Sequence, residues 1–465
     1  MLFSDPIFLL FFALYLSVHL LTPPQYRLHL LIFGSTAFYA WWKPEYAWLP
    51  YLLSTIGWGG VLWIEQAKAS SVRKWRLFVV LAALFTPLAV FKYLHFLVCD
   101  VAGAFTAART QLFGDELRFA LPLGISFITF TLTAYVVNVY RGQFPIERRL
   151  IAILGYVLFF PHLIAGPILR PHELLPQLSK ASKALDASFT LGSSLFVLGL
   201  AKKLIFADAI APYVDLAYAR GAHGAYDYLL AIYGFSMQIY CDFSGYTDMA
   251  VGLAYLLRIR LPRNFSSPYT SNSIIEFWRR WHITLSHWLR DYLYIALGGN
   301  RQGASRQFAN LMITMLIGGL WHGANWTFVI WGGLHGVGIT LNHLFNRAWP
   351  NTKLPACLRI LITFHLVTIA WIYFRAPTLT SAHEVIAGPF TSSSTGFWAF
   401  VSEHAYPLVL LLAFLTAHRF DDHARVRLAV RRAQKPVVWA ILLTVSALAI
   451  AVSHGSSAKF IYFDF

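Results

Sequence analysis

Long apolar runs separated by short polar connectors form the main pattern of this chain. The runs lie near residues 7–21, 28–41, 46–64, 77–98, 119–140, 187–208, 227–256, 311–334, 357–376, 395–418 and 435–453. A helix needs about 20 apolar residues to cross a bilayer core, and shorter runs can tilt or insert in part. The pattern therefore predicts an all-α membrane protein with about 11 spanning segments. Because no internal repeat or low-complexity linker interrupts it, we expect a single domain over residues 1–465.

The composition excludes a soluble globular protein. Hydrophobic residues make up 57% of the chain and charged residues only 12%, whereas roughly a quarter of the residues of a soluble protein are charged. The mean hydropathy is +0.56. A net charge of +16 would suit a nucleic-acid-binding protein, but the basic residues lie in short connectors, as in the cytoplasmic loops of membrane proteins. We therefore expect no nucleic-acid partner.

Two basic connectors predict the orientation of the chain. Residues 65–76 contain four Lys or Arg residues, and residues 418–435 contain six. Such loops stay on the cytoplasmic side, so an even number of crossings is expected between them. The N-terminus lacks the basic start and the cleavage site of a secretory signal. The first apolar run is therefore expected to remain as a membrane helix.

The segment 150–170 differs from its neighbours because it contains helix breakers. Pro161, Gly166 and Pro167 would interrupt a continuous helix within a few residues. Non-helical backbone at membrane depth is tolerated only inside protein or along a cavity. The pattern predicts a bent or re-entrant segment with Arg170 at its mouth, and an ordinary interfacial loop is the alternative.

The apolar run 311–334 carries an ionisable group, His322, near its middle. Ionisable side chains at this depth face the protein interior or a water-filled cavity and are candidates for function. Burial disfavours a charged imidazole, which leaves a neutral ring able to accept a proton. Gly318, Gly319 and Gly323 would let another helix or a thin substrate approach the ring. His322 is thus a candidate general base, and a neutral core histidine is the alternative.

Two carboxylates, Asp242 and Asp248, interrupt the apolar run 227–256. Inside a membrane they should meet a cation, a backbone amide or water. They could be catalytic, but a role as ion-pair partners fits better. The nearby candidate cations are Arg258, Arg260, Arg263, Arg279 and Arg280.

The polar segment 261–303 predicts an amphipathic helix. Ser273 and Glu276 have the spacing of a capping box, which indicates a helix start. On a helical wheel, aromatic and aliphatic residues fall on one face and charged residues on the other. The helix is expected to lie at the membrane surface or across the bundle. His282 would point toward the apolar interior and His287 toward the polar side.

No metal site is expected. Cys99, Cys241 and Cys357 match neither a metal-binding nor a disulfide spacing. His282 and His287 are too far apart around a helix to share one ion, and a zinc-type Glu between them is missing.

Three motifs together resemble the membrane-bound O-acyltransferase family, and most closely its bacterial branch of alginate O-acetyltransferases and teichoic-acid D-alanyl transfer proteins. They are Phe160-Pro-His-Leu-Ile-Ala-Gly-Pro-Ile-Leu-Arg170, the segment from Asn264-Phe-Ser-Ser-Pro-Tyr269 through Arg-Trp-His282 to Arg301, and Leu320-Trp-His-Gly323. Residues 38–42 and 460–465 also resemble that branch, so the likeness extends along the whole chain.

The resemblance implies a multi-helix fold around a tunnel, with His322 as the essential histidine and His282 as the second one. A neutral histidine can deprotonate a hydroxyl while it attacks a thioester or ester carbonyl. His282 could orient that ring, bind the oxyanion or relay the proton. The other candidate substrate- or tunnel-lining residues are Trp321, Gly323, Asn325, Trp281, Asp242, Ser244 and Arg170.

The resemblance therefore implies a membrane-bound O-acyltransferase of the bacterial inner membrane. It would take an acyl group, most simply acetyl, from a cytosolic thioester such as acetyl-CoA, with no bound cofactor. A periplasmic acetyltransferase partner would pass the group to an exported polysaccharide such as alginate or cellulose. Transfer of D-alanine or another acyl group from a carrier protein is the alternative within this class. A proton-coupled transporter or channel is the alternative outside it, although the two related halves typical of transporters are not evident.

Overall fold

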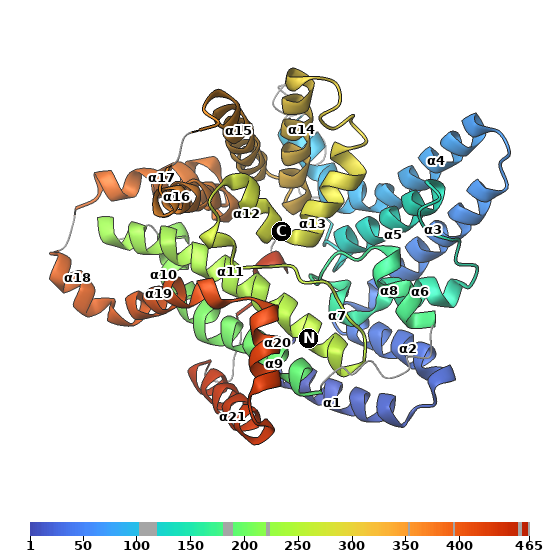
Figure 1. Ribbon diagram of the computed structural model, residues 1–465, viewed down its shortest axis with the longest axis horizontal. Coiled ribbons are helices and arrows are strands. Elements are labelled where there is room, and N and C mark those ends of the chain that lie inside the picture. Colours follow the sequence, from blue (N-terminus) through green and yellow to red (C-terminus); the bar gives the residue numbers. More distant parts are fainter. Residues whose placement is uncertain are drawn as a thin grey trace. The chain divides into compact units, whose positions relative to one another are not determined.

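The computed structural model describes residues 1–101, 119–179, 189–219, 224–351, 354–393, 396–453 and 458–463. Within these ranges the regular structure is helical and contains no strand, which confirms the predicted all-α class (Figure 1). Between the apolar runs 77–98 and 119–140 the sequence predicts a polar turn at residues 106–118, which lies outside the described ranges.

The chain forms two compact units. The N-terminal unit comprises residues 1–189 and 253–262, and the C-terminal unit comprises residues 190–252 and 263–465. The expectation of one functional domain over residues 1–465 stays a prediction.

The N-terminal unit is built around α5, which is buried along nearly its whole length and packs against α3 and α4. Its helices are α1 (Pro6–Leu21), α2 (Arg27–Ala40), α3 (Leu49–Glu65), α4 (Ser70–Leu88), α5 (Ile125–Tyr140), α6 (Leu150–Leu158), α7 (Phe160–Leu163) and α8 (Pro171–Ser179).

The predicted break in the segment 150–170 is present. The helix stops at Phe159, resumes for one turn as α7, and gives way to non-helical backbone before Arg170. Residues 156–169 are buried. The bend is therefore confirmed and lies inside the protein, whereas a re-entrant position in the membrane stays a prediction.

The C-terminal unit contains most of α11 (Ala225–Leu256), the longest described helix, whose 32 residues extend over about 48 Å at 1.5 Å per residue. The other α-helices are α9 (Phe189–Ala201), α10 (Asp208–Ala219), α12 (Ile274–Arg280), α13 (Ile283–Trp288), α14 (Ala304–His322), α15 (Trp326–Ala348), α16 (Ala356–Arg375), α17 (Leu379–Thr391), α18 (Phe397–Glu403), α19 (Ala405–Ala417), α20 (His423–Arg432) and α21 (Lys435–Val452). Short π- and 3₁₀-helical pieces join some of them, among them η7 (Lys202–Ala207), η9 (Leu289–Tyr294), η10 (His418–Phe420) and η11 (Ile461–Phe463).

Several helices could cross a membrane by length and composition. The described residues contain four: Pro44–Glu65, Ser70–Tyr93, Ala356–Arg375 and Lys435–Val452. A fifth arises if α18 and α19, which are bent by 84° at their junction, count as one span. The expected number of about 11 is therefore not confirmed, because several apolar runs break into shorter helices.

The most consequential break lies in the run 311–334, which was expected to be one span. Instead, α14 ends at His322 and α15 begins at Trp326. The two helices pack antiparallel, so that a methyl group on Gly319 would collide with the Phe328 carbonyl oxygen and one on Gly332 with the Met315 carbonyl oxygen. The prediction of one continuous span was wrong, because this run folds back as a hairpin. The depth of His322 in the membrane stays a prediction.

Candidate functional site

The turn between α14 and α15 positions His322 at the last residue of a helix. Gly323 follows in an extended conformation and packs on the Phe328 ring. Asn325 caps α15 by accepting a hydrogen bond from the Thr327 N–H at 3.1 Å, and its Nδ2 donates to the Pro377 carbonyl at 3.0 Å. The amide of Asn325 therefore holds the turn that follows His322, and its role as a lining residue stays a prediction.

The His322 ring lies in a box of aromatic side chains and is 3% exposed. Ring-centroid distances are 4.8 Å to Trp321, 5.0 Å to Trp331, 5.1 Å to Phe374 and 5.6 Å to Tyr462. Aromatic side chains therefore enclose most of this ring, and its role as general base stays a prediction.

His282 is completely buried and has an unusual backbone conformation. Its φ of 40° and ψ of 56° place it in the left-handed region, which a non-glycine residue occupies at a cost of about 1–3 kcal/mol. The helix expected from Ser273 onward is consequently broken into α12, α13 and η9. The helical-wheel placement of His282 relative to His287 does not hold, although His282 does point inward.

The start of that segment was predicted correctly. The Ser273 hydroxyl accepts a hydrogen bond from the Glu276 N–H at 3.1 Å. The Glu276 carboxylate accepts from the Asn272 N–H at 2.7 Å, instead of from Ser273. The first hydrogen bond of the capping box is thus present, and the second comes from the residue before the N-cap.

The amide oxygen of Asn264 holds the His282 ring. This oxygen lies 3.2 Å from His282 Nδ1 and also accepts from the Thr284 N–H at 3.2 Å and the Thr284 hydroxyl at 2.9 Å. Because a carboxamide oxygen can only accept, Nδ1 carries the proton and the neutral ring has its lone pair on Nε2. Nε2 has no hydrogen-bond partner among the residues that the structure describes. His282 is therefore prepared to accept a proton or a hydrogen bond.

Trp321 brings the two histidines together. Its ring centroid lies 6.0 Å from that of His282 and 4.8 Å from that of His322. Trp281 belongs to a neighbouring cluster and packs on Trp371 at 4.8 Å. The structure thus unites His282, His322 and Trp321, with Trp281 supporting them from the next layer.

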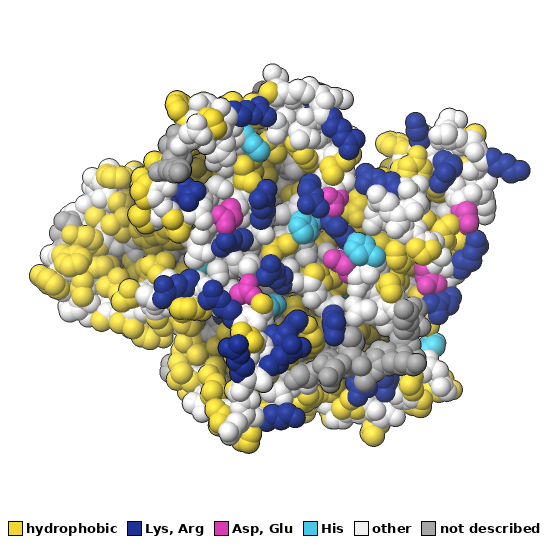
Figure 2. Space-filling model, in the orientation of Figure 1, with side chains coloured by type: hydrophobic (Ala, Val, Ile, Leu, Met, Phe, Trp, Pro, Cys, Tyr) yellow, Lys and Arg dark blue, Asp and Glu magenta, His cyan; other side chains and the backbone are white. Residues whose placement is uncertain are grey.

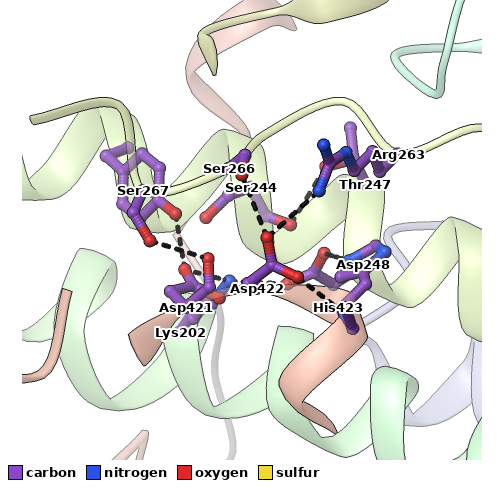
Figure 3. A network of polar contacts seen from close by, with 12 residues as sticks. Lys202, Ser244, Thr247, Asp248, Arg263, Ser266, Ser267, Asp421, Asp422 and His423 are labelled. Atoms are coloured by element: carbon purple, nitrogen blue, oxygen red, sulfur yellow. Dashed lines mark hydrogen bonds and ion pairs between the residues drawn. The ribbon is translucent and has the colours of Figure 1, made fainter. Parts of the chain in front are cut away.

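Asp248 takes part in a buried ion network. Lys202 Nζ lies 2.6 Å from both Asp248 Oδ2 and Asp421 Oδ2. His423 Nε2 approaches Asp248 Oδ1 at 2.6 Å (Figure 3). The prediction of arginine partners was wrong, since the partners are a lysine and a histidine from other helices.

Asp242 forms a second, adjacent network. Lys203 Nζ lies 2.9 Å from Asp242 Oδ1 and 2.7 Å from Asp208 Oδ1. The tail joins this network: the Ile461 N–H donates to Asp242 at 2.8 Å, and Lys203 donates to the Ala458 carbonyl at 2.9 Å. These bonds hold the tail segment that carries Tyr462 against His322. Asp242 therefore anchors the tail, and its role as a lining residue stays a prediction. Here too the prediction of arginine partners was wrong.

The lysine pair was missed as a functional feature. Lys202 and Lys203 interrupt the apolar run 187–208, and cations at such a position need partners. The need of the two lysines for partners could have predicted ion pairs with Asp242 and Asp248, which interrupt the next apolar run.

For Ser244 and Arg170, a role in lining the substrate path stays a prediction. Ser244 lies in α11 with its side chain completely buried. Arg170 belongs to the N-terminal unit, where its backbone N–H donates to Glu173 at 2.6 Å.

Comparison with known proteins gives the family. A sequence profile described as "MBOAT, membrane-bound O-acyltransferase family" matches residues 147–382, which include all three motifs. The chain is 41% identical over 402 residues to "Probable alginate O-acetylase AlgI" of Azotobacter vinelandii, covering 86% of this chain and 79% of that protein.

More distant relatives have other named acceptors. Identity is 36% to "Peptidoglycan O-acetyltransferase" of Helicobacter pylori, over 77% of this chain and 72% of that protein. It is 31% to "Teichoic acid D-alanyltransferase" of Bacillus subtilis, over 56% and 70%. With the profile match over half of its length and such relatives along most of it, the chain belongs to the membrane-bound O-acyltransferase family.

Proposed function

We propose that this enzyme transfers an acetyl group from a cytosolic thioester for O-acetylation of an exported polysaccharide of the alginate type, with His322 as general base. The observation that carries the proposal is the contact of both His322 and His282 with Trp321, inside an aromatic enclosure. The relatives named for alginate O-acetylation support this substrate class.

The chemistry follows from a neutral imidazole. His322 accepts the hydroxyl proton while the hydroxyl oxygen attacks the thioester carbonyl carbon. The carbon–sulfur bond then breaks, and the thiol leaves with the proton returned by the imidazolium. A positioned base of this kind contributes typically 10²–10⁴ in rate.

The hydrogen bond from His282 to Asn264 narrows the role of the second histidine. A neutral ring protonated on Nδ1 has no N–H on Nε2 to donate to an oxyanion. This arrangement supports a role in proton relay or in orienting the acceptor, and disfavours oxyanion stabilisation by the neutral ring.

The cellular setting completes the proposal. The enzyme would reside in the bacterial inner membrane, and a periplasmic acetyltransferase partner would carry the group to the polymer. D-Alanyl transfer is the second candidate, since a relative is named for that reaction. Mass spectrometry of the modified polymer distinguishes the two, because acetyl and D-alanyl esters differ in mass.

The test uses histidine variants in a strain deleted for the gene. His322→Ala and His282→Ala should remove acetyl ester from the exopolysaccharide at unchanged protein abundance. His365→Ala is the matched control, because His365 is exposed on α16. Normal acetyl content in the His322 variant would refute the proposal.

A further inference from the structure

A cavity of about 640 Å³ opens in the N-terminal unit where α3 ends, α4 begins and α5 ends. The segment that follows α5 forms its remaining wall. This volume falls within the range of about 300–1,000 Å³ that is typical of ligand sites. All of its lining residues precede residue 147, where the match to the family profile begins. None of the three sequence motifs therefore contributes to this cavity.

The inner part of the cavity is apolar. Val61 and Ile64 on α3 and Val136 on α5 line it, and all three side chains are buried. Val139 and Ile146 continue this surface outward and are half-buried. Contact with hydrocarbon is favourable here because it removes apolar surface from water. The inner part therefore suits an acyl chain, which a small hydrophilic anion would not supply.

The outer part of the cavity is basic. Lys68 is exposed and Arg73 is half-buried. Glu65 is the one carboxylate among the described lining residues, and Arg148 Nη2 donates to both of its oxygens at 3.0 and 3.1 Å. In the part of the chain that the structure describes, no carboxylate forms an ion pair with Lys68 or Arg73. Two positive charges thus remain beside the apolar surface.

Arg73 is oriented by Tyr140 at the end of α5. Its guanidinium lies 5.4 Å from the centroid of the Tyr140 ring, and its Nη2 donates to the Tyr140 carbonyl at 3.5 Å. A hydrogen bond of this length is weak, and a guanidinium has five N–H donors in all. Arg73 can therefore still donate to a phosphate, which guanidinium groups bind through paired N–H donors.

The turn that carries Lys68 joins two helices that could each cross a membrane. Pro44–Glu65 ends just before it, and Ser70–Tyr93 begins just after it. Trp63 and Trp75 flank the turn and are 38% and 61% exposed, as is typical of tryptophans at a membrane–water interface. Figure 2 shows basic side chains at the edge of the molecule where Figure 1 places α3 and α4. The turn is therefore expected at the level of lipid headgroups, on the cytoplasmic side.

We propose that this cavity binds an anionic phospholipid of the cytoplasmic leaflet, with Lys68 and Arg73 at the headgroup phosphate and an acyl chain along Val61, Ile64 and Val136. Basic pockets beside membrane helices on the cytoplasmic side are typical sites for such lipids. The bound lipid contacts α3, α4 and α5 together, so it stabilises the folded N-terminal unit. This inference goes beyond the proposed function and does not depend on the role of His322.

The test measures lipid binding to the purified full-length enzyme in detergent by native mass spectrometry, with thermal unfolding as a second readout. Phosphatidylglycerol should bind at least about tenfold more tightly than phosphatidylethanolamine, because only the first has a net negative headgroup. It should also raise the thermal midpoint of unfolding. Equal affinities for the two lipids would overturn recognition of an anionic headgroup.

Two soluble probes distinguish a lipid from a free anion. Glycerophosphoglycerol has the headgroup of phosphatidylglycerol without its acyl chains, and inorganic phosphate has the charge alone. Neither should raise the thermal midpoint at the concentration at which phosphatidylglycerol does, because neither fills the apolar part of the cavity. An increase as large as that given by the lipid would identify a site for a soluble anion and overturn the assignment to a phospholipid.

Variants assign the binding to this cavity. Lys68→Glu should weaken phosphatidylglycerol binding at least about tenfold, because it places a negative charge beside the phosphate. Lys74→Glu is the matched control, since Lys74 is exposed in the same basic segment and does not line the cavity. Arg73→Lys keeps the charge and should retain the preference for phosphatidylglycerol over phosphatidylethanolamine. Equal affinities in the Lys68 and Lys74 variants would overturn the cavity as the binding site.

Discussion

Asn264 is the residue whose replacement tests the geometry around His282 most sharply. Its amide oxygen is the acceptor for His282 Nδ1 and for both the N–H and the hydroxyl of Thr284, and Asn264 itself is 1% exposed. Asn264→Ala leaves the imidazole N–H and the Thr284 N–H buried without an acceptor. Each such group costs about 1–3 kcal/mol, so the expected destabilisation is about 2–6 kcal/mol.

The left-handed backbone at His282 adds a second consequence. Its strain of about 1–3 kcal/mol persists only while the surrounding hydrogen bonds enforce it. Without Asn264 we expect the backbone to relax and the ring to leave Trp321. Acetyl transfer should therefore fall by about 10²-fold or more, the lower end of the range for a lost proton-transfer group.

The assay combines thermal unfolding of the purified enzyme with acetyl transfer in the deletion strain. Asn272→Ala is the matched control on the same segment, because the Asn272 side chain donates only to Glu276, which keeps other partners. If Asn264→Ala unfolds at the parental temperature and retains parental transfer, the hydrogen bonds do not hold His282 and the reasoning is refuted.

Three further predictions follow from buried or close-packed groups. Lys203→Met removes the Lys203 charge from the buried Asp242 and the partly buried Asp208, so unfolding should be easier by about 3–5 kcal/mol; a thermal midpoint equal to the parent's would contradict the network. Gly319→Ala should destabilise the hairpin by about 1–3 kcal/mol through overpacking, whereas Gly333→Ala, whose added methyl meets only ordinary contacts, should not. The pKa of Asp422 is lowered in the folded protein, so its ionised carboxylate stabilises the fold. This stabilisation is present above the pKa of about 3.9 in the unfolded chain, and it is lost as the pH falls through the lower pKa of the folded protein. The stability difference between Asp422→Asn and the parent should therefore be larger at pH 6 than at pH 3, and a difference independent of pH would count against it.

The helical class could be predicted from the sequence because apolar periodicity is a local property. The break at His322 could not, because the run 311–334 stays apolar across it. The hairpin depends on the close approach of Gly319 to the Phe328 backbone, which is a tertiary contact. In retrospect, Asn325 could have marked the start of α15. It lies two residues before Thr327, whose N–H it accepts, and this is the spacing of a helix N-cap.

In the candidate site, too, some features could be predicted from the local sequence and others depend on tertiary contacts. His322 was singled out as an ionisable residue in an apolar run, and His282 by the helical wheel and the family motif. The contacts of Trp321 with both rings place them near each other. The left-handed turn at His282 was not predicted, because it is enforced by Asn264 from a separate segment.

The ion networks were assigned to the wrong cations for a similar reason. Lys202 and Lys203 reach the carboxylates because the helix before them and α11 approach at glycines. A methyl group on Gly199 would collide with the Gly245 carbonyl oxygen. Sequence proximity favoured the arginines after α11, whereas this close helix packing brings in the lysines.

The central claim is that His322 accepts the proton of the attacking hydroxyl. The most direct measurement is the acetyl-transfer rate of purified His322→Ala enzyme with acetyl-CoA and a hydroxyl acceptor, at matched donor occupancy. The account predicts a rate at least 10²-fold below that of the parent, with donor affinity unchanged. A rate equal to the parental one at the same donor affinity would contradict it.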